Sequence, residues 1–207
     1  MTLMDKSARD LLSAFSSSDP TPGGGSASAL ASAVGASLLL MVAGLPKTRT
    51  NSAEDRAALD RAASGLAGLR TQLADAVDAD SAAYDDVVAA YRLPKGTAEE
   101  QAARKLAIQR ALRSAIEVPL AVMKLSNQAM LHAAEIAAHG HRAASSDIGV
   151  AVALLQAGAS GARLNIDTNV QSVSDTAYLS SLRSDVAALS NELSTAVGAA
   201  TQTLTIG

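Results

Sequence analysis

One carboxylate, Asp80, interrupts a run of apolar side chains that recurs at steps of three or four residues. That spacing places the run on one face of a helix. The run consists of Leu66, Leu69, Leu73, Val77, Asp80, Tyr84, Val87 and Tyr91. A carboxylate on such a face points inward, where burial raises its pKa and suits it to take up and release a proton. The alternative is a carboxylate satisfied by a neighbouring arginine or hydroxyl group, with no chemical role.

A glycine-rich segment, Thr21-Pro22-Gly23-Gly24-Gly25-Ser26, precedes an expected helix. Free amide groups at a helix N-terminus attract anions, and glycines let a ligand approach the backbone. Gly23, Gly24, Gly25 and Ser26 are therefore candidate binding residues. The spacing matches neither a Walker loop nor a dinucleotide fingerprint. A plain loop that ends in a serine N-cap is the alternative.

Other polar residues near expected helix ends could also contact a ligand. Asp147 follows Ser146 at the start of a helix, where an aspartate commonly just complements the helix dipole. Asn165 and Asn169 are four residues apart, so they share a helical face and could read a heterocycle, or they could cap the helix terminus. Four basic residues could bind an acidic ligand tail or could simply be solvated: Lys47, Arg49, Arg92 and Lys95.

The histidines and cysteines give no metal-binding pattern. His132 and Glu135 reverse the Glu-x-x-His order of di-iron bundles, and no second copy exists. His139 and His141 are expected on an exposed loop. The chain has no cysteine, which excludes disulfides, thiol catalysis and zinc–thiolate sites. We expect no metal site.

Helical signals account for nearly the whole chain. The expected helices cover residues 3–15, 26–45, 52–92, 98–139, 146–165 and 174–203. Leu93-Pro94-Lys95-Gly96 breaks the chain, Thr97 and Glu100 form a capping box, and Asn51 or Ser52 and Ser145 or Ser146 cap two further helices. Pro119 should kink the helix that contains it. No strand pattern appears, so we predict an all-α fold: one domain over residues 1–207, a bundle of about five to six helices.

Composition and charge exclude some classes of protein. The net charge is −3 with no basic run, which argues against nucleic-acid binding. The uncharged stretch 27–45 has 19 residues, nearly the length of a membrane span. It is rich in Ala, Ser and Gly and lacks aromatic or basic anchors on its N-terminal side. A helix buried on all sides inside a bundle therefore fits this stretch better than a membrane-associated helix. No signal-peptide pattern opens the chain, and we expect a cytoplasmic location.

Taken in order, several motifs resemble the cyclodeaminase/cyclohydrolase family of one-carbon folate enzymes, over about residues 7–175. The glycine segment 21–26 is similar to the family's opening motif, and Val77-Asp78-Ala79-Asp80 with Tyr84 to its acidic helix motif. The later matches are Leu93-Pro94-Lys95 with Glu100, Val118-Pro119-Leu120, Ser146-Asp147, Gly161-Ala162, Asn165 and Asn169. Two turns depart from the family pattern, at Pro46-Lys47-Thr48-Arg49 and at His139-Gly140-His141-Arg142.

The resemblance implies an all-helical bundle that works as a homodimer, binds folate in a cleft and needs no cofactor. It makes Asp80 the catalytic proton carrier. The activity it implies is formiminotetrahydrofolate cyclodeaminase, which forms 5,10-methenyltetrahydrofolate and ammonia. Methenyltetrahydrofolate cyclohydrolase, with the same base and pocket, is the alternative. An alternative of another class is a non-catalytic helical dimer that binds folate or a protein partner.

Helix geometry constrains one part of this site. Asp147 and Asn165 are 18 residues apart, which is about 27 Å along an unbroken helix. They can serve one pocket only if the helix ends early or if two subunits contribute; otherwise only one of them is functional.

Overall fold

The computed structural model describes residues 2–206, and the side chains of residues 2–204. The helices are α1 (Ala8–Phe15), α2 (Gly24–Ala43), α3 (Ala53–Arg92), α4 (Ala98–His139), α5 (Ser145–Asn169) and α6 (Thr176–Ile206). Two 3-10 turns, η1 (Arg142–Ala144) and η2 (Val170–Ser172), flank α5. Within residues 2–206 no strand forms, and the one β-bridge joins Thr48 to Gly140. The predicted all-α fold is confirmed.

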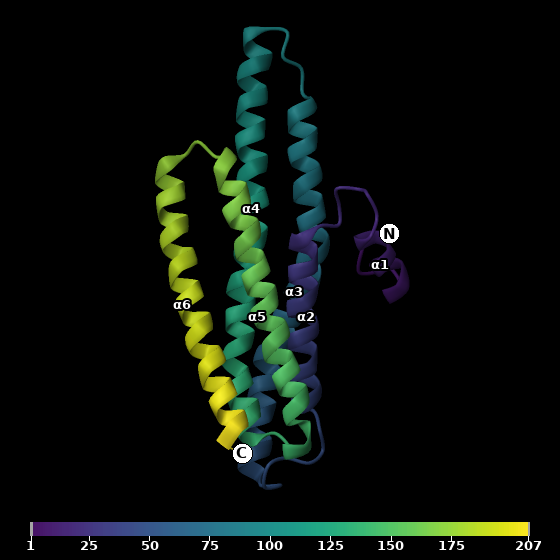
Figure 1. The fold of residues 1–207 in the computed structure, drawn as a ribbon, viewed down its shortest axis with the longest axis vertical. Coiled ribbons are helices and arrows are strands. Elements are labelled where there is room, and N and C mark those ends of the chain that lie inside the picture. Colours follow the sequence, from purple (N-terminus) through teal and green to yellow (C-terminus); the bar gives the residue numbers. More distant parts are fainter. Residues whose placement is uncertain (1, 207) are drawn as a thin grey trace.

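Four long helices form the body of the molecule, with α2 against α3 and α5, and α4 against α3 and α5 (Figure 1). The last helix, α6, packs mainly on α4, and the short α1 lies on the other side of the molecule. Because α3 and α4 have 40 and 42 residues, each is about 60 Å long, twice the length of α2. Their hairpin therefore projects beyond the other helices at one end (Figure 1).

Small side chains bring α2 and α5 into close contact. A Cβ atom at Gly35 would lie 2.9 Å from the carbonyl oxygen of Ala151, and one at Gly158 would overlap the Ser32 hydroxyl. The core between the four helices is aliphatic, with Leu39, Leu66, Ile116, Met130 and Leu155 fully buried. A chain with 2% aromatic residues thus fills its interior by close helix approach.

Helices α3 and α4 begin and end where local signals in the sequence predicted. Ser52 caps α3, and Thr97 and Glu100 form the expected capping box of α4. Helix α4 runs through Pro119 as one segment. The predicted cap of α5 was wrong: Ala144 holds the N-cap position without a side-chain bond, because η1 leads directly into the helix.

Several boundaries differ from the prediction. Helix α1 begins at Ala8, not at residue 3, because Ser7 caps it and the Asp78 carboxylate accepts the amide hydrogens of Leu3 and Met4. Helix α2 covers Gly24–Ala43 instead of residues 26–45, α5 reaches Asn169, and α6 covers Thr176–Ile206.

Among the described residues, α2 is the one helix long and apolar enough to cross a membrane by length and composition. In its most apolar stretch of 18 residues, 56% of the residues are buried within the protein, as expected for a core helix. The prediction that it is buried on all sides was wrong, because Val34 and Met41 on its outer face are 43% and 45% exposed.

Candidate active site

Asp80 lies on α3, half-buried, beside the N-terminus of α2. Its Oδ2 atom accepts two hydrogen bonds from Ser26, one from the backbone N–H at 2.8 Å and one from the hydroxyl at 3.0 Å. The Ser26 hydroxyl also lies 3.2 Å from that of Ser81. Burial raises the pKa of the Asp80 carboxyl, and the two Ser26 hydrogen bonds oppose that shift without cancelling it. No arginine, and no hydroxyl other than that of Ser26, bonds this carboxylate within residues 2–206.

The glycine segment is shaped around this carboxylate. Gly23 is the N-cap of α2, so Ser26 is a first-turn residue and not the cap considered from the sequence. A Cβ atom at Gly25 would overlap the Asp80 carboxyl group. The anion at this helix N-terminus is thus the Asp80 carboxylate, a side chain of the protein itself. Both hydrogen bonds go to Oδ2, and Oδ1 accepts none from any described residue.

A cavity of about 280 Å³ opens in front of Asp80. Its lining comes from the loop before α2, from the first turn of α2, from α3, from α4 and from the end of α5: Pro20, Thr21, Gly23, Gly24, Gly25, Asp80, Tyr84, Val87, Leu112, Ala115, Asn165 and Asn169. Asp80 is the one charged residue in this lining. A cationic group in the cavity would therefore meet a single negative charge and no positive one.

Two asparagines, Asn165 and Asn169, share one face of α5 and line the cavity. Asn165 donates from Nδ2 to the carbonyl oxygen of Gly161 in its own helix, at 2.8 Å. Asn169 donates from Nδ2 to the carbonyl oxygen of Ala115 in α4, at 2.9 Å. Pro119 has no N–H to bond that oxygen four residues earlier, so the proline leaves an acceptor that Asn169 uses. Each amide oxygen remains able to accept a hydrogen bond from a ligand.

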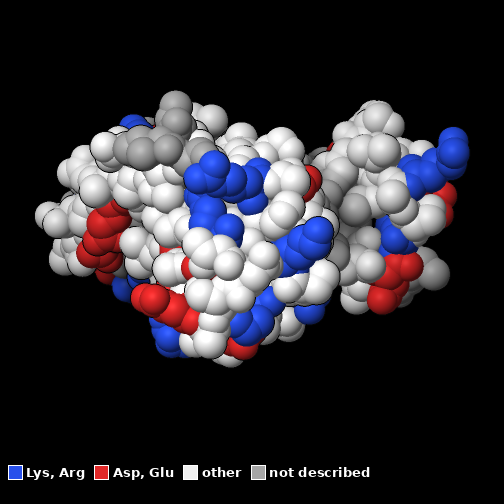
Figure 2. Space-filling model, turned by 90° about the horizontal axis from the view of Figure 1, so that it is seen from below, with Lys and Arg blue, Asp and Glu red and all other residues white. Residues whose placement is uncertain are grey.

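Three other predicted binding residues lie at the opposite end of the protein. Arg49 donates to the carbonyl oxygens of Ala137 and Ala138 at the end of α4, and Asp147 is in the first turn of α5. Lys47 stands in the same α2–α3 loop as Arg49. Figure 2 views the molecule from this end, and Lys and Arg side chains gather on it. Because α5 is unbroken from Ser145 to Asn169, Asp147 and Asn165 do not share a cavity within one chain.

The apolar stripe of α3 is inward-facing over only part of its length. Leu66, Leu73 and Val77 are fully buried, but Tyr84 and Tyr91 are 41% and 49% exposed, so the prediction of a continuous buried stripe was wrong there. The C-terminal end of α3 belongs to the hairpin that extends beyond the other helices, where fewer helices pack against it (Figure 1). Tyr84 lines the cavity instead of the core.

His139 and Asp55 form a pair that the sequence did not reveal. His139, expected on an exposed loop, is the last residue of α4, and its Nδ1 lies 2.9 Å from Asp55 Oδ1. Asp55 also accepts the N–H of Thr50 at 2.7 Å. The contact with His139, followed by the Thr50 bonds, holds the pKa of Asp55 well below its usual value. The pair joins the start of α3 to the end of α4. No group of three or more metal-binding side chains occurs in the described part of the chain.

Comparison with known proteins gives a consistent result. Residues 7–203 match the family described as formiminotransferase-cyclodeaminase. The chain is 40% identical over 167 residues to a methenyltetrahydrofolate cyclohydrolase of Methylorubrum extorquens, covering 81% of this chain and 80% of that protein. It is 31% identical over 194 residues to a formimidoyltransferase-cyclodeaminase of Sus scrofa, covering 94% of this chain but only 36% of that longer protein.

The fold also matches a solved structure. A formiminotetrahydrofolate cyclodeaminase from Thermotoga maritima superposes with a TM-score of 0.85, at 21% identity, and the match covers 96% of each chain. At that identity the likeness concerns the fold alone.

Proposed function

The chain belongs to the formiminotransferase-cyclodeaminase family, and on that basis we propose that it hydrolyses 5,10-methenyltetrahydrofolate to 10-formyltetrahydrofolate, with Asp80 as the proton carrier. One observation carries the proposal: a half-buried carboxylate with a raised pKa lines a cavity that has no other charged residue, and one of its two oxygens accepts no hydrogen bond from a described residue. Such a group suits a reaction that takes a proton from water and stabilises a cationic carbon.

The proposed reaction has two proton transfers. Water attacks the carbon that bridges N5 and N10, and Asp80 Oδ1 takes a proton from that water as the C–O bond forms. The bond between this carbon and N5 then breaks, and Asp80 returns its proton to N5. The hydroxyl proton leaves to solvent, so a formyl group remains on N10 and one proton is released overall. Acid–base help of this kind accelerates a reaction by roughly 100- to 10,000-fold.

The substrate's charge favours this cavity. The methenyl bridge of the substrate carries a positive charge delocalised over its two nitrogens, and Asp80 supplies the matching negative charge. Ser26 holds Oδ2 with two hydrogen bonds, which keeps the carboxylate oriented while Oδ1 exchanges protons. The amide oxygens of Asn165 and Asn169 can accept hydrogen bonds from the N–H groups of the pteridine. No step uses a metal or a nucleotide.

The relatives favour two reactions at the same site. The 40% identical relative, of which the match covers 80%, is named as a cyclohydrolase, and this supports water as the reactant. The family description and the second relative support cyclodeamination as a second candidate. In that reaction N10 of 5-formiminotetrahydrofolate attacks the formimino carbon and ammonia leaves. Asp80 would move the N10 proton to the departing nitrogen, so the same carboxylate serves both reactions.

A spectrophotometric assay tests the proposal, because methenyltetrahydrofolate absorbs strongly in the near ultraviolet. The purified protein should make this absorbance decay faster than in buffer if it is a cyclohydrolase. With 5-formiminotetrahydrofolate, appearance of the same absorbance and release of ammonia would identify a cyclodeaminase. The Asp80→Asn variant at the same concentration corrects for uncatalysed hydrolysis. Binding of both folates without turnover of either would overturn the proposal in favour of a non-catalytic folate-binding protein.

A further inference from the structure

The N-terminal segment, residues 2–22, is fastened to the helical bundle by one carboxylate. Asp78 of α3 accepts the backbone N–H of Leu3 at Oδ1 and that of Met4 at Oδ2, the latter at 3.4 Å. Among the described residues, no other hydrogen bond and no ion pair joins this segment to helices α2 to α5. The side chain of Leu3 adds an apolar contact with the main core. Asp78 is therefore the polar anchor of the segment.

Helix α1, which belongs to this segment, has little else to hold it. It stands at the side of the molecule and packs extensively on none of the long helices (Figure 1). It has eight residues, too few to be a stable helix by itself in water. Leu11 is its one buried residue, and Leu12 is 70% exposed. The order of α1 therefore depends on the anchor that precedes it.

The chain that follows the segment is fastened to the same turn of α3. Asp80, two residues after Asp78, accepts the N–H and the hydroxyl hydrogen of Ser26 in the first turn of α2. Positions two residues apart are about 200° apart around a helix, so the two carboxylates leave α3 on different sides. One turn of α3 thus holds the chain both before α1 and after the loop that leads to α2.

Between these two anchors the chain forms one wall of the candidate active-site cavity. Pro20, Thr21 and Gly23 line it from the loop before α2. The side-chain hydrogen bonds of residues 16–19 stay within the segment and reach no other helix among the described residues. The position of this wall therefore depends on the anchors at its two ends.

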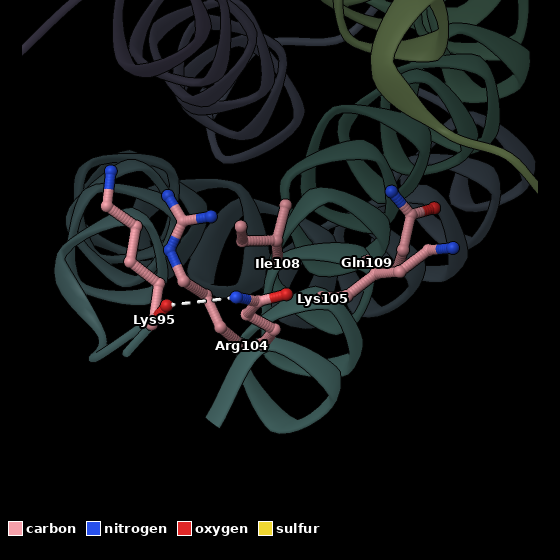
Figure 3. Close-up of a pocket in the computed structure, with 6 residues that line it drawn as sticks. Lys95, Arg104, Lys105, Ile108 and Gln109 are labelled. Carbon is pink, nitrogen blue, oxygen red and sulfur yellow. Dashed lines mark hydrogen bonds between the residues drawn. The ribbon is translucent and has the colours of Figure 1, made fainter. Parts of the chain in front are cut away.

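Other connections in the bundle are fixed by side-chain hydrogen bonds of their own. In the α3–α4 turn, Gln101 donates to the carbonyl oxygen of Lys95 at 3.2 Å (Figure 3). After α5, the side-chain oxygen of Gln109 on α4 accepts the N–H of Ser174 at 2.9 Å. The loop before α2 has no comparable bond to α3, α4 or α5 within the described chain. It is the wall of the cavity that is held least directly.

We propose that Asp78 is a positioning residue for the reaction at Asp80: it holds residues 2–22 as a strap that closes one side of the cavity. Asp78 does not line the cavity, so it acts through the strap and not on the substrate. The role in substrate binding rests on the proposed function. When the strap is released, only the fraction of molecules in which it is closed binds substrate well, and the apparent affinity falls by that fraction.

Asp78→Ala removes the acceptor, and Asp78→Asn keeps the shape and one acceptor oxygen but not the charge. The control is Asp75→Ala, which removes an exposed carboxylate three residues earlier on α3. Release of the strap is measured by trypsin cleavage after Lys6 and Arg9, with the N-terminal peptides identified by mass spectrometry. The effect on the site is measured as kcat and KM for 5,10-methenyltetrahydrofolate.

Asp78→Ala should be cleaved at these two sites about 10-fold faster than the wild type, the effect of losing one hydrogen bond to a charged group. Its KM should rise about fivefold, as for a strap that is closed in roughly one fifth of the molecules. Its kcat should stay within about twofold, because Ser26 and Asp80 are unchanged and the strap is closed in the substrate complex. Asp78→Asn should change cleavage and KM in the same direction by about half as much on a logarithmic scale, since a neutral acceptor forms weaker bonds. Asp75→Ala should match the wild type.

Equal cleavage of the wild-type and Asp78→Ala proteins would overturn the inference alone. So would faster cleavage with an unchanged KM, because Asp78 would then anchor the segment without serving the site. A fall in kcat at unchanged KM would also overturn it, since that pattern belongs to a group acting on the reacting atoms. A wild-type protein that turns over neither folate would overturn the proposed function and the role in substrate binding with it.

Discussion

Asn169 donates a hydrogen bond to the carbonyl oxygen of Ala115, the acceptor that Pro119 leaves free in α4. The contact joins the end of α5 to the middle of α4 at the edge of the Asp80 cavity. A residue that weakens one helix therefore positions a polar residue of another helix. The proline is useful here for the backbone oxygen that it leaves unbonded.

Replacing Pro119 by Ala tests this coupling. The new N–H should bond the Ala115 oxygen within α4, so Asn169 loses its partner and kcat/KM falls about fivefold, the equivalent of one hydrogen bond. In the wild-type background Asn169→Ala should cost about 1 to 2 kcal/mol in the free energy of unfolding, because the Ala115 oxygen loses its partner. In the Pro119→Ala background the same change should cost much less. Urea unfolding of the four proteins measures this, and additive costs would contradict it.

Asp80→Asn should lower kcat by roughly 100- to 10,000-fold and leave the fold intact. Because burial raises the pKa of Asp80 in the folded protein, the folded state holds its proton more tightly than the unfolded chain. Asp80 therefore costs stability as pH rises through the carboxyl range and into neutral conditions. At pH 7 the variant should therefore be at least as stable as the wild type. The difference between their free energies of unfolding should be smaller at acidic pH.

Asp86→Asn, an exposed change on the same helix, is the matched control and should retain activity. Activity assays with unfolding curves at pH 4 and pH 7 make the comparison. Near-full turnover by the Asp80→Asn protein would contradict the assignment.

Ser26→Ala should move the acidic limb of the pH–rate profile to higher pH. The Ser26 hydroxyl lowers the pKa of Asp80, so its removal lets the effect of burial act more fully. The deprotonated carboxylate of Asp80 then forms only at a higher pH. The backbone N–H of residue 26 still donates to Oδ2. Ser28→Ala removes a neighbouring hydroxyl that donates to the Gly24 carbonyl and should leave the limb unmoved. A limb unchanged by Ser26→Ala would mean that another group controls it.

Much of the fold could be predicted because its signals are local. The capping box at Thr97 and Glu100 and the break at residues 93–96 each depend on a few neighbouring residues, and both occur where expected. Asp80 could be singled out because helical periodicity alone places it among buried neighbours. The exposed positions of Tyr84 and Tyr91 could not be predicted, since periodicity does not show where a long helix extends beyond its partners.

The contacts that shape the site could not be predicted, because they join distant segments. Asp80 and Ser26 are 54 residues apart, and so are Asn169 and Ala115. His139 and Asp55 are separated by 84 residues, and nothing in the sequence near either one indicates the other. The glycine segment indicated an anion but not which one, since a side chain of α3 and a bound ligand satisfy the same amide groups.

A homodimer remains a prediction, and the outer face of α2 is the surface that we expect it to bury. Helix α2 contains no charged residue, and Val34 and Met41, two turns apart on one face, are 43% and 45% exposed. Val34→Glu combined with Met41→Glu should convert a dimer to a monomer in light scattering. Leu131→Glu, at an exposed position on α4, should not. A wild-type mass of one chain at micromolar concentration would contradict the prediction.

Gly25→Ala tests whether Asp80 must lie where the structure places it. The added methyl group would overlap the carboxyl group, so Asp80 or α2 must shift. We expect a loss of about 1 to 3 kcal/mol in the free energy of unfolding, from overpacking. We also expect kcat to fall about 100-fold, because a displacement near 1 Å removes the alignment of a catalytic group. Gly68→Ala is the control: a Cβ there meets nothing within 4 Å in the middle of α3, and it should stabilise the protein by about 0.5 to 1 kcal/mol. A Gly25→Ala protein with wild-type kcat would show that the carboxylate does not need this position for catalysis.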